Sequence, residues 1–166
     1  MTINKNVFWK SGSHLEFADD LRGRYLSFTS VLETMLSEII TKYFCNNDQR
    51  KGLFFTEIAN GQAMSFSIKI NILSKIIKKD YRDILLKYPD IIKRLNVIRD
   101  FRNKLAHAAV DLSEDALEKD GRFGVGFITF KNGKRHIKHV SLEDSINNYH
   151  DIAKVILILR ELKGLL

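Results

Sequence analysis

The chain has little cysteine, proline or tryptophan, with one of each among its 166 residues. A single cysteine, Cys45, cannot form an internal disulfide and excludes a zinc site built from several cysteines. We expect Cys45 to be a small buried residue in a helix. No segment has the basic and then apolar order of a signal peptide, and no apolar run approaches membrane-spanning length. We therefore expect a cytoplasmic protein that does not act at a membrane.

Length and composition are those of one ordinary globular domain. Hydrophobic residues make up 45% of the chain and charged residues 28%, a balance typical of a folded domain with a polar surface. The length is sufficient to bury a hydrophobic core. Because no repeat or linker-like segment interrupts the sequence, we expect a single domain over residues 1–166.

The positive charge of the chain is unevenly distributed. The formal net charge is +7, and the segment from Lys69 to Lys104 carries all of this excess, with eleven Lys or Arg against four Asp. A second segment, 122–139, contains no acid and carries Arg122, Lys131, Lys134, Arg135 and Lys138. Such a field attracts phosphate backbones. The alternative is an ordinary solvated surface with scattered lysines.

Apolar residues recur at helical spacing along most of the chain, which predicts a mainly α-helical fold. The predicted helices cover 13–44, 65–79, 81–88, 89–108 and 141–163. The inward face of the first is predicted to be Phe17, Leu21, Tyr25, Phe28, Leu32, Met35, Ile39 and Tyr43. That of the second is Phe66, Ile70, Leu73 and Ile77, and that of the last is Ile146, Tyr149, Ala153, Ile156 and Leu157. Polar composition predicts an irregular lead-in over 1–12 and a loop over 45–61, in which residues 53–55 are a candidate helical turn.

Capping residues and one turn divide the remaining sequence. Ser13 with Glu16, and Ser141 with Asp144, have the spacing of helix capping boxes. Asn132-Gly133 is a strong hairpin turn, which predicts a β-hairpin over about 122–140. The segment 111–120 is predicted to be a connecting loop. The expected fold is therefore a bundle of about five helices with one β-hairpin before the C-terminal helix.

The helix 89–108 carries Arg102, Asn103 and His107 near its end. At about 100° per residue, Arg102 points about 40° from the buried Ile98, Asn103 about 140° and His107 about 180°. Asn103 and His107 are four positions apart and can touch. Arg102 must instead curl round the helix to join them, or a partner protomer must supply the facing half of a site. A permanent charge at the edge of an apolar face is costly without a partner or ligand.

The spacing R-N-x3-H, formed by Arg102, Asn103 and His107, resembles the motif of the HEPN superfamily of small helical domains. The family includes metal-independent ribonucleases of prokaryotic defence, toxin–antitoxin and CRISPR-associated systems, and non-catalytic members. The HEPN toxins that are paired with nucleotidyltransferases carry a tyrosine two residues after the histidine. Ala109 stands there in this chain, so that paired system is not indicated. The R-N-x-x-A-H run is also similar to mannitol-operon-repressor-like proteins, which implies a non-enzymatic regulator as the alternative.

The HEPN resemblance implies an endoribonuclease that needs no metal or cofactor. It also implies a homodimer whose two motifs share one RNA-binding cleft, and regulation by an antitoxin or another protein. Histidine ordinarily titrates near neutral pH, so His107 would exchange protons with the 2′-hydroxyl or the leaving 5′-oxygen. Arg102 would stabilise the charge on the scissile phosphate, and Asn103 would orient the histidine or the phosphate. Arg99 and Lys104 would bind RNA through its phosphates.

Other candidate sites are weaker. His136 and His139 face opposite sides of a strand, so we expect no metal site there. The aromatic strand 127–130 half-matches an RNA-recognition motif, but the surrounding strand–helix alternation is missing. The alternative interpretation of the motif assigns it no function: Asn103 and His107 would be ordinary surface residues of a helix, and Arg102 would pair with an acid such as Glu38 or Asp151. A further alternative is an interaction protein in which the motif packs a dimer seam.

Overall fold

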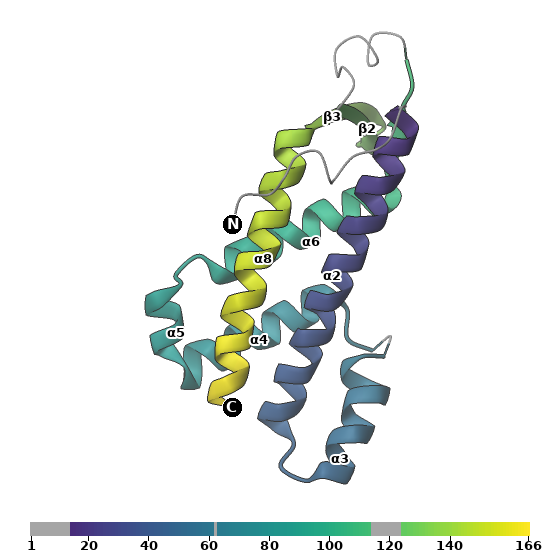
Figure 1. Cartoon of the computed structure of the whole chain (residues 1–166). Coiled ribbons are helices and arrows are strands. Elements are labelled where there is room, and N and C mark those ends of the chain that lie inside the picture. The colour runs from purple at the N-terminus through teal and green to yellow at the C-terminus, as the bar shows by residue number, and fades with distance from the viewer. Residues whose placement is uncertain (1–13, 62, 114–123) are drawn as a thin grey trace. The chain divides into compact units, whose positions relative to one another are not determined.

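The computed structural model describes residues 14–61, 63–113 and 124–166 (Figure 1). Its helices are α2 (His14–Phe44), α3 (Asp48–Leu53), the π-helix η1 (Phe54–Ala59), α4 (Phe66–Asp80), α5 (Arg82–Lys87), α6 (Ile91–His107) and α8 (Leu142–Leu165). Its strands are β1 (Ala109–Asp111), β2 (Gly124–Lys131) and β3 (Lys134–Ser141). The predicted mainly α-helical fold is confirmed, with six α-helices among the described residues. The predicted lead-in 1–12, the Ser13 cap and Arg122 lie outside the described residues.

The chain divides into two compact units, and each of α2, α6 and α8 contributes to both. The first unit combines residues up to Leu26 with Arg102–Tyr149, and therefore contains the sheet and the end of α6. The second combines Ser27–Phe101 with His150–Leu166, and contains α3, η1, α4 and α5. The predicted site residues fall in the first unit, except Arg99.

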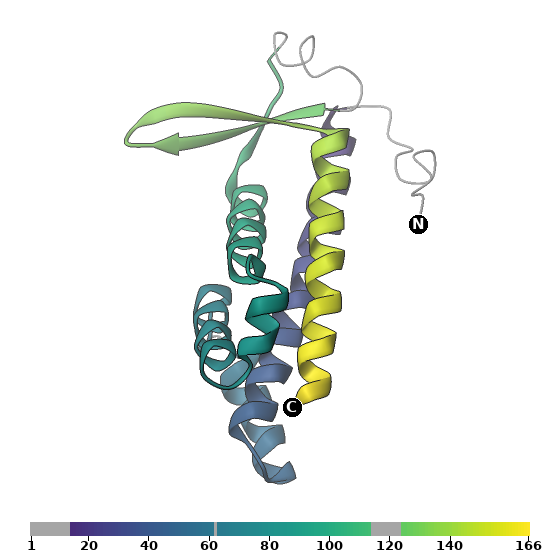
Figure 2. The same ribbon diagram turned by 90° about the vertical axis from the view of Figure 1, so that its left-hand side faces the viewer.

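The sheet of the first unit has three antiparallel strands in the order β1-β2-β3. Asn132 (φ 52°) and Gly133 (φ 72°) are both left-handed, as expected for the turn of a two-residue hairpin. The predicted hairpin is confirmed, and its β2–β3 ribbon can be followed in Figure 2. Strand β1 was not predicted. It is only three residues long, which is too short to show the alternation of apolar and polar residues by which a strand is recognised in a sequence. Its pairing with Gly126–Ile128 identifies it as a strand.

The predicted capping box at the start of α8 is confirmed. The Ser141 backbone N–H donates to Asp144 Oδ2 at 3.0 Å, and the Asp144 N–H donates back to Ser141 Oγ at 3.1 Å. One turn further on, the Tyr149 ring lies 6.1 Å from the Tyr25 ring, and its hydroxyl donates to the Leu21 carbonyl at 3.5 Å. Burial raises the pKa of Tyr149, so this side chain stays a neutral donor.

The core of the second unit is formed by helices whose apolar stripe was evident in the sequence. Ser65 caps α4 by accepting from the Ile68 N–H, and the four residues predicted to face inward on α4 are buried. The buried apolar side chains of the other long helices in this unit are Leu32, Met35, Leu36, Ile39 and Ile40 of α2, Ile91, Leu95, Ile98 and Phe101 of α6, and Ile152, Val155, Ile158, Leu159 and Leu162 of α8.

The predicted loop over 45–61 is wrong, because this segment forms α3 and η1. Asn47 caps α3 by accepting from the Arg50 N–H at 3.2 Å, and α3 buries no residue. The Ser37 hydroxyl of α2 donates to the carbonyl of Ala59 at 2.8 Å and so attaches the end of η1. Polar composition indicated a loop, but the polar residues of this segment belong to exposed helical turns. The cap at Asn47 and the contact between Ser37 and Ala59 hold these turns. Cys45 follows the end of α2 and is half-buried, so the expected buried helical position is also wrong.

Two predicted inward faces need correction. Phe28 of α2 is 42% exposed, although most of its predicted stripe is buried. On α8, Tyr149 is buried as predicted, but Ala153 and Leu157 are exposed, and the buried positions include Ser145, Ile152, Val155, Ile158, Leu159 and Leu162. The run 155–159 is apolar on all sides, so its period does not determine which side faces the core. Even with this run, no helix among the described residues has the length and hydropathy needed to cross a membrane.

Candidate functional site

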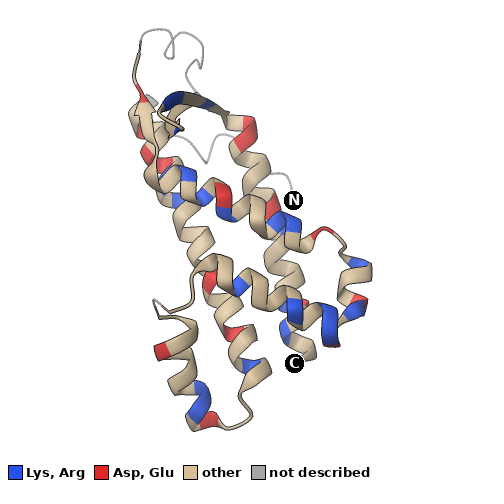
Figure 3. Cartoon of the chain, turned by 180° about the vertical axis from the view of Figure 1, so that it is seen from behind, with Lys and Arg blue, Asp and Glu red and all other residues tan. Residues whose placement is uncertain are grey.

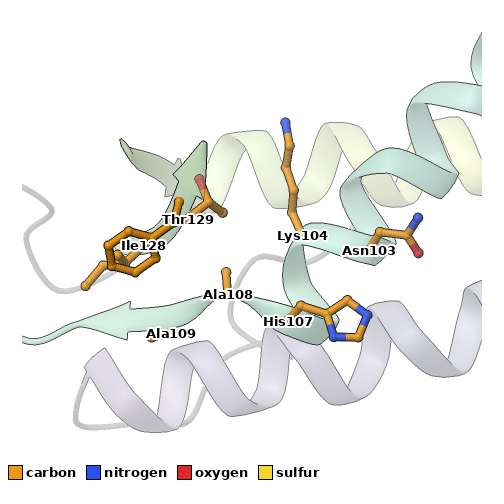
Figure 4. Close-up of a pocket in the computed structure, with 8 residues that line it drawn as sticks. Asn103, Lys104, His107, Ala108, Ala109, Ile128 and Thr129 are labelled. Carbon is orange, nitrogen blue, oxygen red and sulfur yellow. The ribbon is translucent and has the colours of Figure 1, made fainter. Parts of the chain in front are cut away.

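A pocket of about 460 Å³ lies in the first unit, where α6 ends and the sheet begins. From α6 and β1 it is lined by Asn103, Lys104, His107, Ala108 and Ala109. The other wall is Ile128, Thr129 and Phe130 of β2. Because α6 runs almost directly into β1, and β1 pairs with β2, the topology brings the hairpin against the motif (Figure 4).

The three motif-region residues of this pocket are accessible from outside. Asn103, Lys104 and His107 are all exposed, and for Asn103 and His107 this agrees with their predicted directions away from the buried Ile98. In Figure 4 the Lys104 side chain extends away from the His107 ring. Phe101 and Leu105 are buried on the other side of the same turns, so the helix holds the polar residues on a packed support.

Arg102 is half-buried and is not among the described residues that line the pocket. Its Nη1 donates to Asn103 Oδ1 at 3.2 Å. Arg102 is therefore linked to the pocket through the Asn103 amide, which lines it. The two acids considered as alternative partners pair elsewhere in the second unit, Glu38 with Lys163 at 2.7 Å and Asp151 with Arg94.

Arg99 is held by neighbours on its own helix. Its Nη1 donates to Asn96 Oδ1 at 2.7 Å, and its Nη2 lies 2.7 Å from Asp100 Oδ1. Its side chain is 23% exposed, and it does not line the pocket. Of the two residues predicted to bind RNA, only Lys104 is placed at the pocket.

Arg22 of α2 supports the site and was not found from the sequence. Its guanidinium donates to the carbonyl of Ala108, the residue after His107, and lies 5.3 Å from the centre of the Phe127 ring. Carbonyls at a helix C-terminus lack helical partners and carry partial negative charge, so a cation there is favourable. Arg22 thus fixes the junction of α6 and β1 against β2. No local pattern indicates this contact, because its partners are 86 residues apart.

An ion pair between β1 and β3 stabilises the sheet. Asp111 of β1 is only 3% exposed, and its Oδ2 lies 3.1 Å from Arg135 Nη2 of β3. The Ser113 N–H also donates to Asp111 Oδ1, at 3.2 Å. The hydrogen bond from Ser113 and the charge of Arg135 hold the pKa of Asp111 below its usual range. The carboxylate therefore stays ionised and pairs with Arg135, which the register places on the same face of the sheet as Phe130.

No group of three His, Cys, Asp or Glu side chains placed to hold a metal occurs in the described part of the chain. His136 pairs with Thr129 and His139 with Gly126, so the two imidazoles lie on opposite faces of β3. The polar side chains that line the α6 pocket are the His107 imidazole, the Asn103 amide, the Lys104 ammonium and the Thr129 hydroxyl.

Comparison of the chain with protein-family models, curated proteins and solved structures finds no match. The resemblance to HEPN proteins rests on Arg102, Asn103 and His107 and on the helical pattern around them. What the site does must be argued from its pocket and from the chemistry of the residues that line it.

Proposed function

We propose that this chain is a metal-independent endoribonuclease of a prokaryotic defence or toxin-type system, acting on RNA in the cytoplasm. The observation that carries the proposal is that His107, Asn103 and Lys104 line one accessible pocket. The pocket combines a proton-transfer group, an amide already bonded to Arg102 and a cation for phosphate. The net charge of +7 favours a polyanionic substrate.

RNA carries its own nucleophile, so such a site needs only to position the substrate, transfer protons and stabilise charge. The 2′-oxygen attacks the adjacent phosphorus, the new O2′–P bond forms, and the P–O5′ bond breaks. His107 accepts the 2′-hydroxyl proton or donates one to the departing 5′-oxygen. Arg102 and Asn103 stabilise the charge on the non-bridging oxygens. The products are a 2′,3′-cyclic phosphate and a 5′-hydroxyl.

A homodimer would complete this site. Arg102 reaches the pocket of its own chain only through Asn103, and it points about 140° from His107 on the helix. In a symmetric dimer the same surface of each subunit faces the other. Two motifs facing one cleft would then place an arginine opposite each histidine.

The test is cleavage of single-stranded RNA oligonucleotides by the purified chain with EDTA present. We expect the parent to cut and to leave cyclic phosphate ends, and His107→Ala to lose about a hundredfold or more of the rate. The matched control is His150→Ala, which removes an exposed histidine of α8 outside the pocket and should cut normally. Parental rates in a folded His107→Ala variant would exclude the mechanism.

The competing function is a non-catalytic regulator or interaction module that binds a protein or nucleotide through the same pocket. Its supporting observation is that Arg102 does not line the pocket and Arg99 is held by Asn96 and Asp100. This function predicts no RNA turnover by the parent on any substrate. It also predicts ligand binding that survives His107→Gln.

A further inference from the structure

One aromatic side chain of the sheet is left open beside the motif. Phe130 is 74% exposed and lines the pocket with His107, whereas Phe127, three positions earlier on β2, is 2% exposed. The residue directly opposite Phe130 on β3 is Arg135, a charged side chain. A large exposed ring bordering a pocket is the usual arrangement for a flat ligand that stacks.

The surface leading from His107 to Phe130 is apolar. Ala109 pairs with Ile128, which in turn pairs with Ile137, so these three side chains form a row on one face of the sheet. Phe130 lies two residues beyond Ile128 and belongs to the same face. A nucleobase fits such a surface, whereas a sugar–phosphate backbone does not.

Positive charge lies in the pocket and along the hairpin. Lys104 lines the pocket, and the segment Gly124–Ser141 contains Lys131, Lys134, Arg135 and Lys138 but no acid. Arg135 shares the face of Phe130 and is paired with Asp111, whereas the three lysines of the hairpin belong to the opposite face. Figure 3 shows Lys and Arg as a blue stretch of the hairpin ribbon. Within the described residues, no ion pair involves Lys104, Lys131 or Lys134. A stacking ring next to lysines is how proteins bind single-stranded nucleic acid.

We propose that the β2–β3 hairpin is the substrate-binding arm of this protein, and that Phe130 stacks an unpaired base next to His107 while Lys104 binds the neighbouring phosphate. This inference rests on the proposed function, because it assigns the class of RNA that the site accepts. A base within an RNA duplex is stacked and paired, and cannot lie on Phe130. The substrate is therefore single-stranded, and the hairpin selects it without reading its sequence.

Binding is measured separately from cleavage. Fluorescence anisotropy with a labelled 12-nucleotide RNA, single-stranded or annealed to its complement, is recorded in a His107→Ala background at low salt with EDTA. We expect tighter binding of the single strand, and about tenfold weaker binding after Phe130→Ala. Phe130→Trp, which keeps a stacking ring, should restore it. Lys104→Gln should weaken binding of all sequences and lower the dependence on salt.

The matched control is Phe44→Ala, which removes another exposed phenyl ring that does not line the pocket. It should bind as the His107→Ala background does. Equal binding by Phe130→Ala, equal affinity for the duplex, or no RNA binding at low salt would each overturn the proposal. Hairpin-dependent binding without cleavage by the parent would support the binding arm and contradict the ribonuclease function, so the two failures are distinguishable.

Discussion

At the scale of single residues, arginines of this chain have different roles because their surroundings differ. Arg22 binds the Ala108 carbonyl and the face of Phe127, Arg99 binds Asn96 and Asp100, and Arg102 binds Asn103. From the sequence, Arg102 and Arg99 were connected with a function, whereas Arg22 was not. Arg22 contributes more directly to the geometry around His107, since Arg22 binds the carbonyl of Ala108, the residue that follows His107.

The Asp144 carboxylate shows how one side chain makes stability depend on pH. Hydrogen bonds from the Ser141 backbone N–H and hydroxyl, at 3.0 and 2.9 Å, hold the pKa of Asp144 below its ordinary value. A carboxyl with a lowered folded-state pKa adds stability above its ordinary pKa, and that stability is lost as the pH falls through the folded-state value. Acidification should therefore loosen the start of α8.

We expect Asp144→Asn to lower the free energy of unfolding by about 0.5–1 kcal/mol at neutral pH, because it removes a charge from the first turn of α8. The difference from the parent should begin to shrink as the pH falls below about 4, the ordinary range of a carboxyl, and should disappear once the pH is below the lowered folded-state pKa of Asp144. Urea unfolding at several pH values measures it. Glu143→Gln, in the same turn but outside the capping box, is the control and should have a smaller effect. A difference that does not depend on pH would contradict the capping role.

At the scale of elements, each helix is stabilised according to how much of it is buried. Helix α4 buries Phe66, Ile70, Leu73 and Ile77 as well as Lys69, whose ammonium lies 3.6 Å from Glu33. Helix α3 buries nothing and depends on its caps. We therefore expect α4 to resist opening and α3 to exchange its amide protons early, since exposed hydrogen bonds open most easily.

Truncating a leucine of α4 tests this ranking. Leu73 is fully buried, so Leu73→Ala should destabilise the chain by about 2–5 kcal/mol through lost burial and a residual cavity. Leu86 of α5 is 80% exposed, and Leu86→Ala makes the same chemical change with an effect of about 0.5 kcal/mol or less. Thermal and urea unfolding of both variants give the comparison. Equal losses of unfolding free energy in the two variants would mean that burial of Leu73 does not stabilise the core of this unit.

At the scale of the whole molecule, the question is whether one copy of the chain is sufficient for catalysis. The pocket of a single copy contains His107 but not Arg102. If two copies share a cleft, a variant lacking the histidine and a variant lacking the arginine supply complementary parts. The proposed site is then a property of the assembly.

Mixing inactive His107→Ala and Arg102→Ala proteins should restore part of the RNA cleavage, because mixed dimers contain one intact arginine and one intact histidine. Light scattering establishes the dimer, and labelled subunits establish that exchange occurs. The control is the His107→Ala protein alone at the same total concentration. If subunits exchange and activity stays absent, the composite site is excluded. Dissociation of the dimer by Arg102→Ala would instead assign the motif to a packing seam.

The candidate site was foreseen only in part. The helical position of Asn103 and His107 follows from the period of α6, so their exposure could be predicted from buried neighbours such as Ile98. The opposite wall, Ile128 to Phe130, could not, because it is brought to α6 through β1. That strand has three residues and no pattern of its own.

The sequence by itself determined the features that depend on neighbouring residues. These are the inward face of α4, the outward directions of Asn103 and His107 on α6, the Asn132-Gly133 turn and the cap at Ser141, since side chains within a few positions decide each of them. Only the tertiary structure decided the side of α8 that is buried, the helical state of 48–59 and the pocket joining α6 to the hairpin. The reason is physical. The run 155–159 of α8 is apolar on all sides, so packing decides which side is buried. A short polar helix is unstable without a tertiary contact. A pocket forms only where segments distant in the sequence meet.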